Sequence, residues 1–156
     1  MPEKINIAIV DDHAMFRNGL AVLINLFAGY TVLFDAGNGK EFIDKLSPQQ
    51  LPDIVLMDIS MPVMDGYATT EWLHNNYPQI KVLALSTMDA ETAIIKMIKS
   101  GAKGYVLKDA DTDELKRALD EVISRGYFYN ETITRKVMQA VTQLTDTKNK
   151  IKQPLL

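Results

Sequence analysis

Three aspartates, a serine and a lysine each stand where a short, mostly apolar run of this sequence ends. In chain order they are Asp11, Asp12, Asp58, Ser86 and Lys108. Carboxylates and hydroxyls can bind hard metal ions, an aspartate can attack phosphorus as a nucleophile, and an ammonium can hold an anion. What they do depends on whether the fold brings them together.

The charges of these groups restrict their chemistry if they share one cleft. Two carboxylates about 4 Å apart repel by roughly 4 kcal/mol at an effective dielectric near 20. Lys108 supplies a single positive charge, which does not balance three carboxylates. We therefore expect a hard divalent cation with oxygen ligands, namely Mg²⁺, which keeps water ligands for an incoming phosphate. An incomplete all-oxygen site of this kind is typical of phosphoryl transfer.

Asp58 differs from the other two aspartates because it stands alone within "DIVLMDISMPVMDG", ahead of a loop. It could be a helix or turn cap, a metal ligand or a nucleophile. We expect it to be the nucleophile, forming an aspartyl phosphate. In this division of labour Asp11 and Asp12 hold the metal ion, while Ser86 and Lys108 hold phosphoryl oxygens.

The same residues have simpler interpretations. The pair Asp11 and Asp12 could merely cap the helix that follows, since aspartate is a favoured N-cap. Asp58 could be a turn residue ahead of Pro62, although this does not explain the unbroken apolar run before it. His13 follows the acidic pair, and without a histidine cluster it is interpreted as an exposed residue of a first helical turn.

Two neighbouring hydroxyl residues compete for one place in the site. Ser86 and Thr87 are adjacent, and only one of two successive strand residues can face a given side. The separation from Asp58 and Lys108 favours Ser86, and Thr87 is the alternative.

The elements that must position these residues follow from hydrophobic patterning. Runs that predict strands cover residues 5–10, 31–36, 53–57, 80–86 and 104–108. Several are almost wholly apolar, which is typical of strands covered on both faces of a parallel sheet. Amphipathic stretches between them predict helices, so we expect an α/β fold with right-handed crossovers. Such sheets bind ligands beyond the carboxyl ends of their strands, where the residues above are expected.

Capping signals and one further helical pattern complete the expected architecture. Asp65 is expected to cap the helix that follows "MPVMDG". Asp111, with Glu114 three residues later, is expected to cap the helix that begins just after Asp111. A last helix is predicted over 131–144, and it is followed by a polar, lysine-rich tail. Its apolar positions are Ile133, Val137, Ala140, Val141 and Leu144.

Composition excludes several classes of protein. The chain has 156 residues, of which 47% are hydrophobic and 24% charged, which fits one globular domain with an appendage. A net charge of -3 argues against bulk nucleic-acid binding. Without cysteine there are no disulfides, thiolate metal sites or cysteine nucleophiles. No run is long enough to span a membrane and no signal-peptide layout is present, so we expect a cytoplasmic protein.

Four motifs carry a family resemblance. "IVDDH", "DIVLMDISMPVMDG", "LALST" and "GAKGYVLKD" occur in this order and together resemble the receiver domain of bacterial two-component response regulators, over about residues 5–126. The resemblance implies a flavodoxin-like, five-stranded parallel sheet of order 2-1-3-4-5, with helices on both faces and here an extra C-terminal helix.

The resemblance also implies partners and roles. Asp58 would accept a phosphoryl group from a phosphohistidine on a sensor histidine kinase or phosphotransfer protein. Mg²⁺ would be held by Asp11, Asp12, Asp58 and the backbone carbonyl of Ser60, and Lys108 would contact the phosphoryl group. Such a domain catalyses its own phosphorylation and dephosphorylation but is not an enzyme in the ordinary sense.

By the same resemblance the site would drive a switch. Ser86 would turn towards the phosphoryl group, and Tyr105 would follow into the space vacated. The surface formed by residues 90–125 is one through which receivers form homodimers, so a homodimer there is a further expectation.

The subgroup is suggested by "YVLKD", in which Asp109 stands where many receivers have proline. This motif is similar to regulators of the NarL/LuxR type, which carry a C-terminal helix-turn-helix domain and control transcription. We expect residues 1–126 to be the receiver, and 127–156 a linker helix and polar tail leading to a DNA-binding domain missing from this chain. A stand-alone receiver with a tail is the alternative.

Two rival functions use similar residues. A pseudo-receiver would be a phosphorylation-independent interaction module, but such modules usually lack one of the acidic or lysine residues. A haloacid dehalogenase-like phosphatase would need a second aspartate two residues after the nucleophile, and Ser60 stands there.

Overall fold

The computed structural model describes residues 3–152, and the side chains of residues 3–143. The end of the predicted tail, 153–156, and the side chain of Leu144 lie outside the described residues. The elements, in chain order, are β1 (Ile5–Val10), α1 (Ala14–Leu26), β2 (Tyr30–Ala36), α2 (Gly39–Lys45), β3 (Ile54–Met57), α3 (Gly66–Asn76), β4 (Lys81–Ser86), α4 (Glu91–Ser100), β5 (Gly104–Leu107), α5 (Thr112–Arg125), β6 (Phe128–Tyr129) and α6 (Glu131–Lys152).

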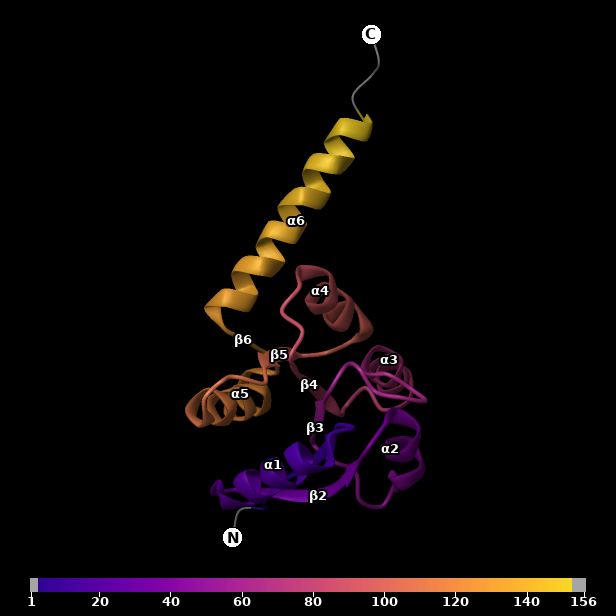
Figure 1. Ribbon diagram of the computed structural model, residues 1–156, viewed down its shortest axis with the longest axis vertical. Coiled ribbons are helices and arrows are strands. Elements are labelled where there is room, and N and C mark those ends of the chain that lie inside the picture. The colour runs from indigo at the N-terminus through magenta and orange to yellow at the C-terminus, as the bar shows by residue number, and fades with distance from the viewer. Residues whose placement is uncertain (1–2, 153–156) are drawn as a thin grey trace.

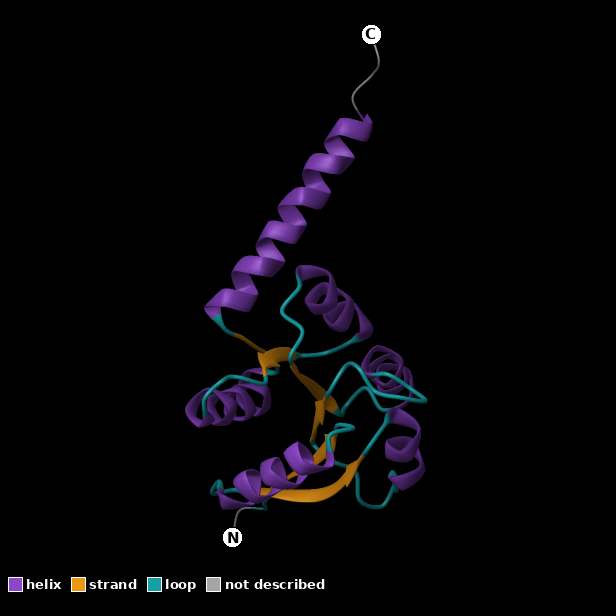
Figure 2. Ribbon diagram, in the orientation of Figure 1, coloured by secondary structure: helices purple, strands orange, loops and turns teal. Residues whose placement is uncertain are grey.

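A central sheet of six parallel strands has the order β2-β1-β3-β4-β5-β6 (Figure 1). Helices α1 and α5 cover one face, while α2, α3 and α4 cover the other (Figure 2). The predicted order of the first five strands is confirmed. The sequence predicted five strands and missed β6, because two residues are too few to show the hydrophobic pattern of a strand.

The register of the sheet brings strand ends to a common level. Val10 of β1 pairs with Met57 of β3, so Asp11 and Asp58 follow paired residues. The amide of Asp58 donates to the carbonyl of Val10 at 2.9 Å, which extends the ladder to the first residue of the loop. Both strands are buried up to these ends, so the aspartates emerge from the sheet interior.

Two of the predicted helix caps are confirmed. Asp65 accepts a hydrogen bond from the Ala68 amide at the start of α3, and Asp111 accepts one from the Glu114 amide at the start of α5. The side chain of Glu114 does not complete a reciprocal capping box, because its Oε1 accepts from the Asn130 side-chain amide. Glu114 thus links α5 to the start of α6.

The last helix is longer than predicted and belongs partly to the core. α6 has 22 residues, so it is about 33 Å long at 1.5 Å per residue. Its first turns lie beside α4, and its later turns extend beyond the sheet (Figure 1). Ile133 is fully buried in the apolar cluster on the α2–α3–α4 face of the sheet. In the described part of the chain, no helix is both long and apolar enough to cross a membrane.

Candidate functional site

The three predicted aspartates meet at the carboxyl end of the sheet. One potential ligand atom from each of Asp11, Asp12, Asp58 and His13 lies within 4.8 Å of the others. Asp11 and Asp58 are buried, whereas Asp12 and His13 are exposed. The cluster therefore has a buried floor and an open rim, through which a small charged ligand can enter.

Lys108 joins the buried carboxylates. Its Nζ lies 2.7 Å from Asp11 Oδ2 and 3.2 Å from Asp58 Oδ2. The ring of Phe16 lies under the same ammonium, with its centroid 4.7 Å away, so the positive charge also faces an aromatic surface. The predicted meeting of Lys108 with the acidic residues is thus present in the structure.

Burial and neighbouring charges shift the proton affinities of this pair. Burial, followed by the negative charge of Asp11, raises the pKa of Asp58, and this outweighs the opposing effect of Lys108. Burial by itself lowers the pKa of Lys108, but its hydrogen bond to Asp11 and the charge of Asp58 leave the pKa above its usual value. The lysine stays charged, while two carboxylates compete for it.

Asp11 is held in place by its neighbours. Its Oδ1 accepts a hydrogen bond from the His13 amide at 2.8 Å, and its backbone carbonyl accepts one from Arg17 Nη1. Arg17 in turn pairs with Asp35, the penultimate residue of β2. The acidic pair is not the N-cap of α1, since the cap position belongs to His13.

The loop after Asp58 folds back against this residue. The Ile59 amide donates to Asp58 Oδ1, and the Gly66 amide donates to the Ile59 carbonyl. A Cβ atom on Gly66 would lie 2.0 Å from the carbonyl oxygen of Asp58, so only glycine fits there. A tight turn at Val63, whose φ is 70°, reverses the direction of this loop.

Ser86 and Tyr105 are both buried and both contact the segment after β4. Ser86 Oγ accepts a hydrogen bond from the Met88 amide at 3.0 Å, and the Tyr105 hydroxyl donates to the Met88 carbonyl at 2.5 Å. Burial raises the pKa of Tyr105 to about 12, so its hydroxyl remains a donor. The two predicted switch residues therefore share Met88 as a partner, a link that their spacing in the sequence did not predict.

Two other predicted positions lie at the rim. Ser60 is exposed in the loop after β3, and its role as a carbonyl ligand stays a prediction. Thr87, the alternative to Ser86, is exposed and helps to line a hollow of about 250 Å³ beside Lys108.

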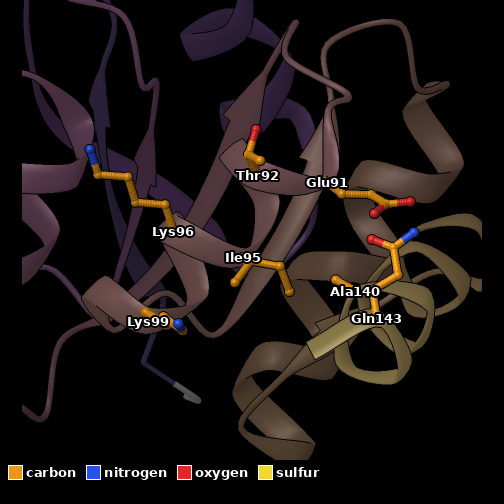
Figure 3. Close-up of a pocket in the computed structure, with 7 residues that line it drawn as sticks. All are labelled: Glu91, Thr92, Ile95, Lys96, Lys99, Ala140 and Gln143. Atoms are coloured by element: carbon orange, nitrogen blue, oxygen red, sulfur yellow. The ribbon is translucent and has the colours of Figure 1, made fainter. Parts of the chain in front are cut away.

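A larger hollow, of about 510 Å³, lies away from the acidic cluster between α4 and α6 (Figure 3). It is lined by Glu91, Thr92, Ile95, Lys96, Lys99, Ala140 and Gln143. Its floor is the outer side of α4, and no residue of the acidic cluster lines it. This hollow is therefore separate from the acidic cluster.

The sequence interpretation missed His13 as a member of the cluster. The residue is exposed, as expected, but its ring lies 3.4 Å from Asp11 Oδ1 and 3.3 Å from Asp12 Oδ1. The sequence feature that could have indicated this is the position of His13 directly after the acidic pair at a strand end.

Comparison with known proteins identifies the family. The profile of the response regulator receiver domain matches residues 7–120. The chain is 34% identical to the transcriptional regulatory protein DegU of Brevibacillus brevis, over 92% of this chain and 60% of that protein. It is 32% identical to the nitrate/nitrite response regulator protein NarL of Escherichia coli K12, over 85% of this chain and 61% of that protein.

The fold agrees with these relatives. A solved two-component response regulator of the LuxR family from Aurantimonas sp. SI85-9A1 matches with a TM-score of 0.81 and 27% identity, over 90% of this chain and 99% of that one. The chain belongs to the response regulator receiver domain family, and its relatives are of the NarL/LuxR type. It spans about 60% of the length of these two curated relatives. A receiver domain is a signalling module.

Proposed function

We propose that this chain accepts a phosphoryl group on Asp58 from a phosphohistidine of a sensor kinase, in a Mg²⁺-dependent reaction. The observation that carries the proposal is the burial of Asp58 at a strand end, among two further carboxylates and within 3.2 Å of Lys108. In the reaction a carboxylate oxygen of Asp58 attacks phosphorus, the P–N bond of the phosphohistidine breaks, and the imidazole leaves with the electron pair.

The donor set fits a hard cation. Three carboxylates with ligand atoms within 4.8 Å face one ammonium, which leaves excess negative charge. Asp11, Asp12, Asp58 and the carbonyl of Ser60 would hold Mg²⁺, which when bound neutralises phosphoryl oxygens during transfer. Lys108, which bridges two carboxylates in the structure, would then be available to a phosphoryl oxygen.

The switch would act through the segment after β4. Ser86 would donate to the phosphoryl group, and its bond from the Met88 amide would change as it turns. The Tyr105 hydroxyl donates to the carbonyl of Met88, so a movement of Met88 would change the hydrogen bonds of both Ser86 and Tyr105. This supports Ser86 and Tyr105 as the residues that convert the new charge into a change of the β4–α4 loop.

The output proposed for the whole protein is transcriptional control through a DNA-binding domain outside this chain. Residues 1–126 would be the receiver, and the helix and tail of 127–156 the linker to that domain. The relatives named above are a transcriptional regulator and a nitrate/nitrite response regulator. We place the protein in the cytoplasm, where a kinase would reach it, and propose homodimer formation through residues 90–125.

Binding of a phosphoryl mimic tests the site. Beryllofluoride, followed by ¹⁹F NMR, should give a bound signal that requires Mg²⁺ and disappears in Asp58→Asn. The exposed Asp44→Asn on α2 should retain it. Failure of the wild-type protein to bind either Mg²⁺ or the mimic would favour a pseudo-receiver. Turnover of p-nitrophenyl phosphate would favour a phosphatase, and we expect none.

A further inference from the structure

His13 occupies the N-cap position of α1 without acting as a cap. N-cap residues normally accept a hydrogen bond from an amide in the first helical turn, which is why Ser, Thr, Asp and Asn are preferred there. The His13 side chain makes no such bond. Its backbone amide donates to Asp11 Oδ1 at 2.8 Å, which fixes the residue beside the acidic pair. Capping therefore does not explain this histidine.

The imidazole of His13 lies at the solvent-exposed side of the acidic cluster. Its Nδ1 lies 3.4 Å from Asp11 Oδ1 and 3.3 Å from Asp12 Oδ1, with the side chain 70% exposed. The same nitrogen falls within the 4.8 Å group that contains the Asp58 carboxylate. It can thus supply a ligand from the solvent side, while Asp11 and Asp58 supply ligands from the buried side.

A nitrogen ligand changes which ions a site prefers. Mg²⁺ favours oxygen ligands and retains waters, whereas imidazole suits later first-row transition-metal ions. We propose that His13 is a fourth side-chain ligand when a transition-metal dication occupies the acidic site, so that His13 sets its selectivity between such ions and Mg²⁺. This rests on the metal site of the proposed function and deepens it, by assigning a residue outside the three carboxylates.

The experiment compares Co²⁺ with Mg²⁺ by isothermal titration calorimetry on the wild-type chain and on His13→Gln. We expect the variant to lose about tenfold or more in Co²⁺ affinity, since even supporting residues of metal sites contribute that much. Its Mg²⁺ affinity should stay within roughly threefold, because water can replace the nitrogen. The matched control is His74→Gln, which changes the other histidine, on α3.

A second readout reports coordination itself. Co²⁺ bound to the wild-type protein should produce hyperfine-shifted histidine ring resonances in the ¹H NMR spectrum. They should vanish in His13→Gln and persist in His74→Gln. Thermal melting without metal checks that the exposed substitution leaves the fold intact.

The outcomes separate this inference from the proposed function. Equal losses for both ions, or no loss for either, would overturn the role of His13 while leaving the acidic site in place. Absence of shifted histidine resonances in Co²⁺-loaded wild-type protein would overturn it as well. If the wild-type chain binds neither ion, both the proposed function and this inference fail.

Discussion

At the residue scale, two buried carboxylates compete for one ammonium. The side chains of Asp11, Asp58 and Lys108 are 3%, 7% and 11% exposed. Burying charges is costly even when they are paired, and here two buried carboxylates share one ammonium. The excess negative charge of the site therefore favours binding of a cation.

Removing the charge of Asp58 should stabilise the protein when no metal ion is added. Because the pKa of Asp58 is raised on folding by burial and by Asp11, its ionised form opposes folding. This penalty is fully present above the folded pKa and disappears as the pH falls towards the unfolded value. We expect Asp58→Asn to raise the free energy of unfolding at pH 7 by about 1 kcal/mol, a usual size for one substitution.

Urea denaturation at several pH values checks this prediction. The gain should shrink as the pH is lowered, whereas Asp44→Asn, at an exposed position of α2, should show no such gain. A loss of stability in Asp58→Asn at neutral pH would contradict the charge argument.

Gly66 should tolerate no side chain. A Cβ there would lie 2.0 Å from the Asp58 carbonyl oxygen and 2.8 Å from the Ile59 Cα, both backbone atoms. We expect Gly66→Ala to lower the free energy of unfolding by roughly 1–3 kcal/mol, as overpacked sites do. Gly19→Ala is the control, because nothing lies within 4 Å of its Cβ in α1, and alanine there should add about 0.5–1 kcal/mol. Similar behaviour of the two variants in chemical denaturation would refute the close approach.

The sequence could predict the acidic residues and Lys108 because each lies where a run of apolar strand residues ends. Parallel strands end at one edge, so the meeting of these side chains follows from the topology. The sequence could not predict that His13 joins the cluster, because this depends on the side-chain conformation of His13 at the start of α1. The bond between Glu114 and Asn130 joins elements that no local pattern connects.

At the element scale, α6 is anchored to the receiver at its first turns. Asn130 Oδ1 accepts from the Ile133 amide at the helix start, and the Ile133 side chain is fully buried. Lys136 Nζ donates to the carbonyl of Asp89, in the loop between β4 and α4. α6 therefore contacts the loop between β4 and α4, in which Met88 is hydrogen-bonded to Ser86 and Tyr105.

Shortening Ile133 should loosen this anchor. Ile133→Ala removes a fully buried side chain, and such changes cost about 2–5 kcal/mol. Since the loss is confined to the docking of α6, amide hydrogen exchange should accelerate in α6 before it does in the sheet. Met138→Ala, at a side chain 59% exposed, should change stability by no more than about 0.5 kcal/mol. Unchanged exchange in α6 of Ile133→Ala would show that the anchor lies elsewhere.

The position of α6 also bears on dimer formation. Part of α4 lies against α6, and β6 occupies the edge beside β5. A homodimer through residues 90–125 would therefore include α6 or require its displacement.

The strands and α6 show which elements sequence patterning can predict and which it cannot. Five strands were predictable because their apolar runs are long enough to show burial, whereas β6 is identified only by its pairing with β5. The start of α6 was predictable from its apolar spacing. Its continuation to Lys152 was not, because the residues after 144 are largely polar.

At the scale of the whole molecule, metal binding should be visible as stability. A ligand present at one hundred times its Kd, and bound only by the folded state, adds about 2.7 kcal/mol. We expect Mg²⁺ to raise the melting temperature of the wild-type protein and of Asp44→Asn, but not of Asp12→Asn. A rise of equal size in Asp12→Asn, measured by differential scanning fluorimetry, would place the ion outside the acidic cluster.

The central claim is that the whole fold presents Asp58 for phosphorylation, and intact-mass spectrometry tests it most directly. The protein is incubated with acetyl phosphate and Mg²⁺, beside Asp58→Asn and a sample containing EDTA. We predict a single phosphoryl adduct on the wild-type chain that is absent from both controls. No adduct on the wild-type chain, or an adduct that survives Asp58→Asn, would contradict the account.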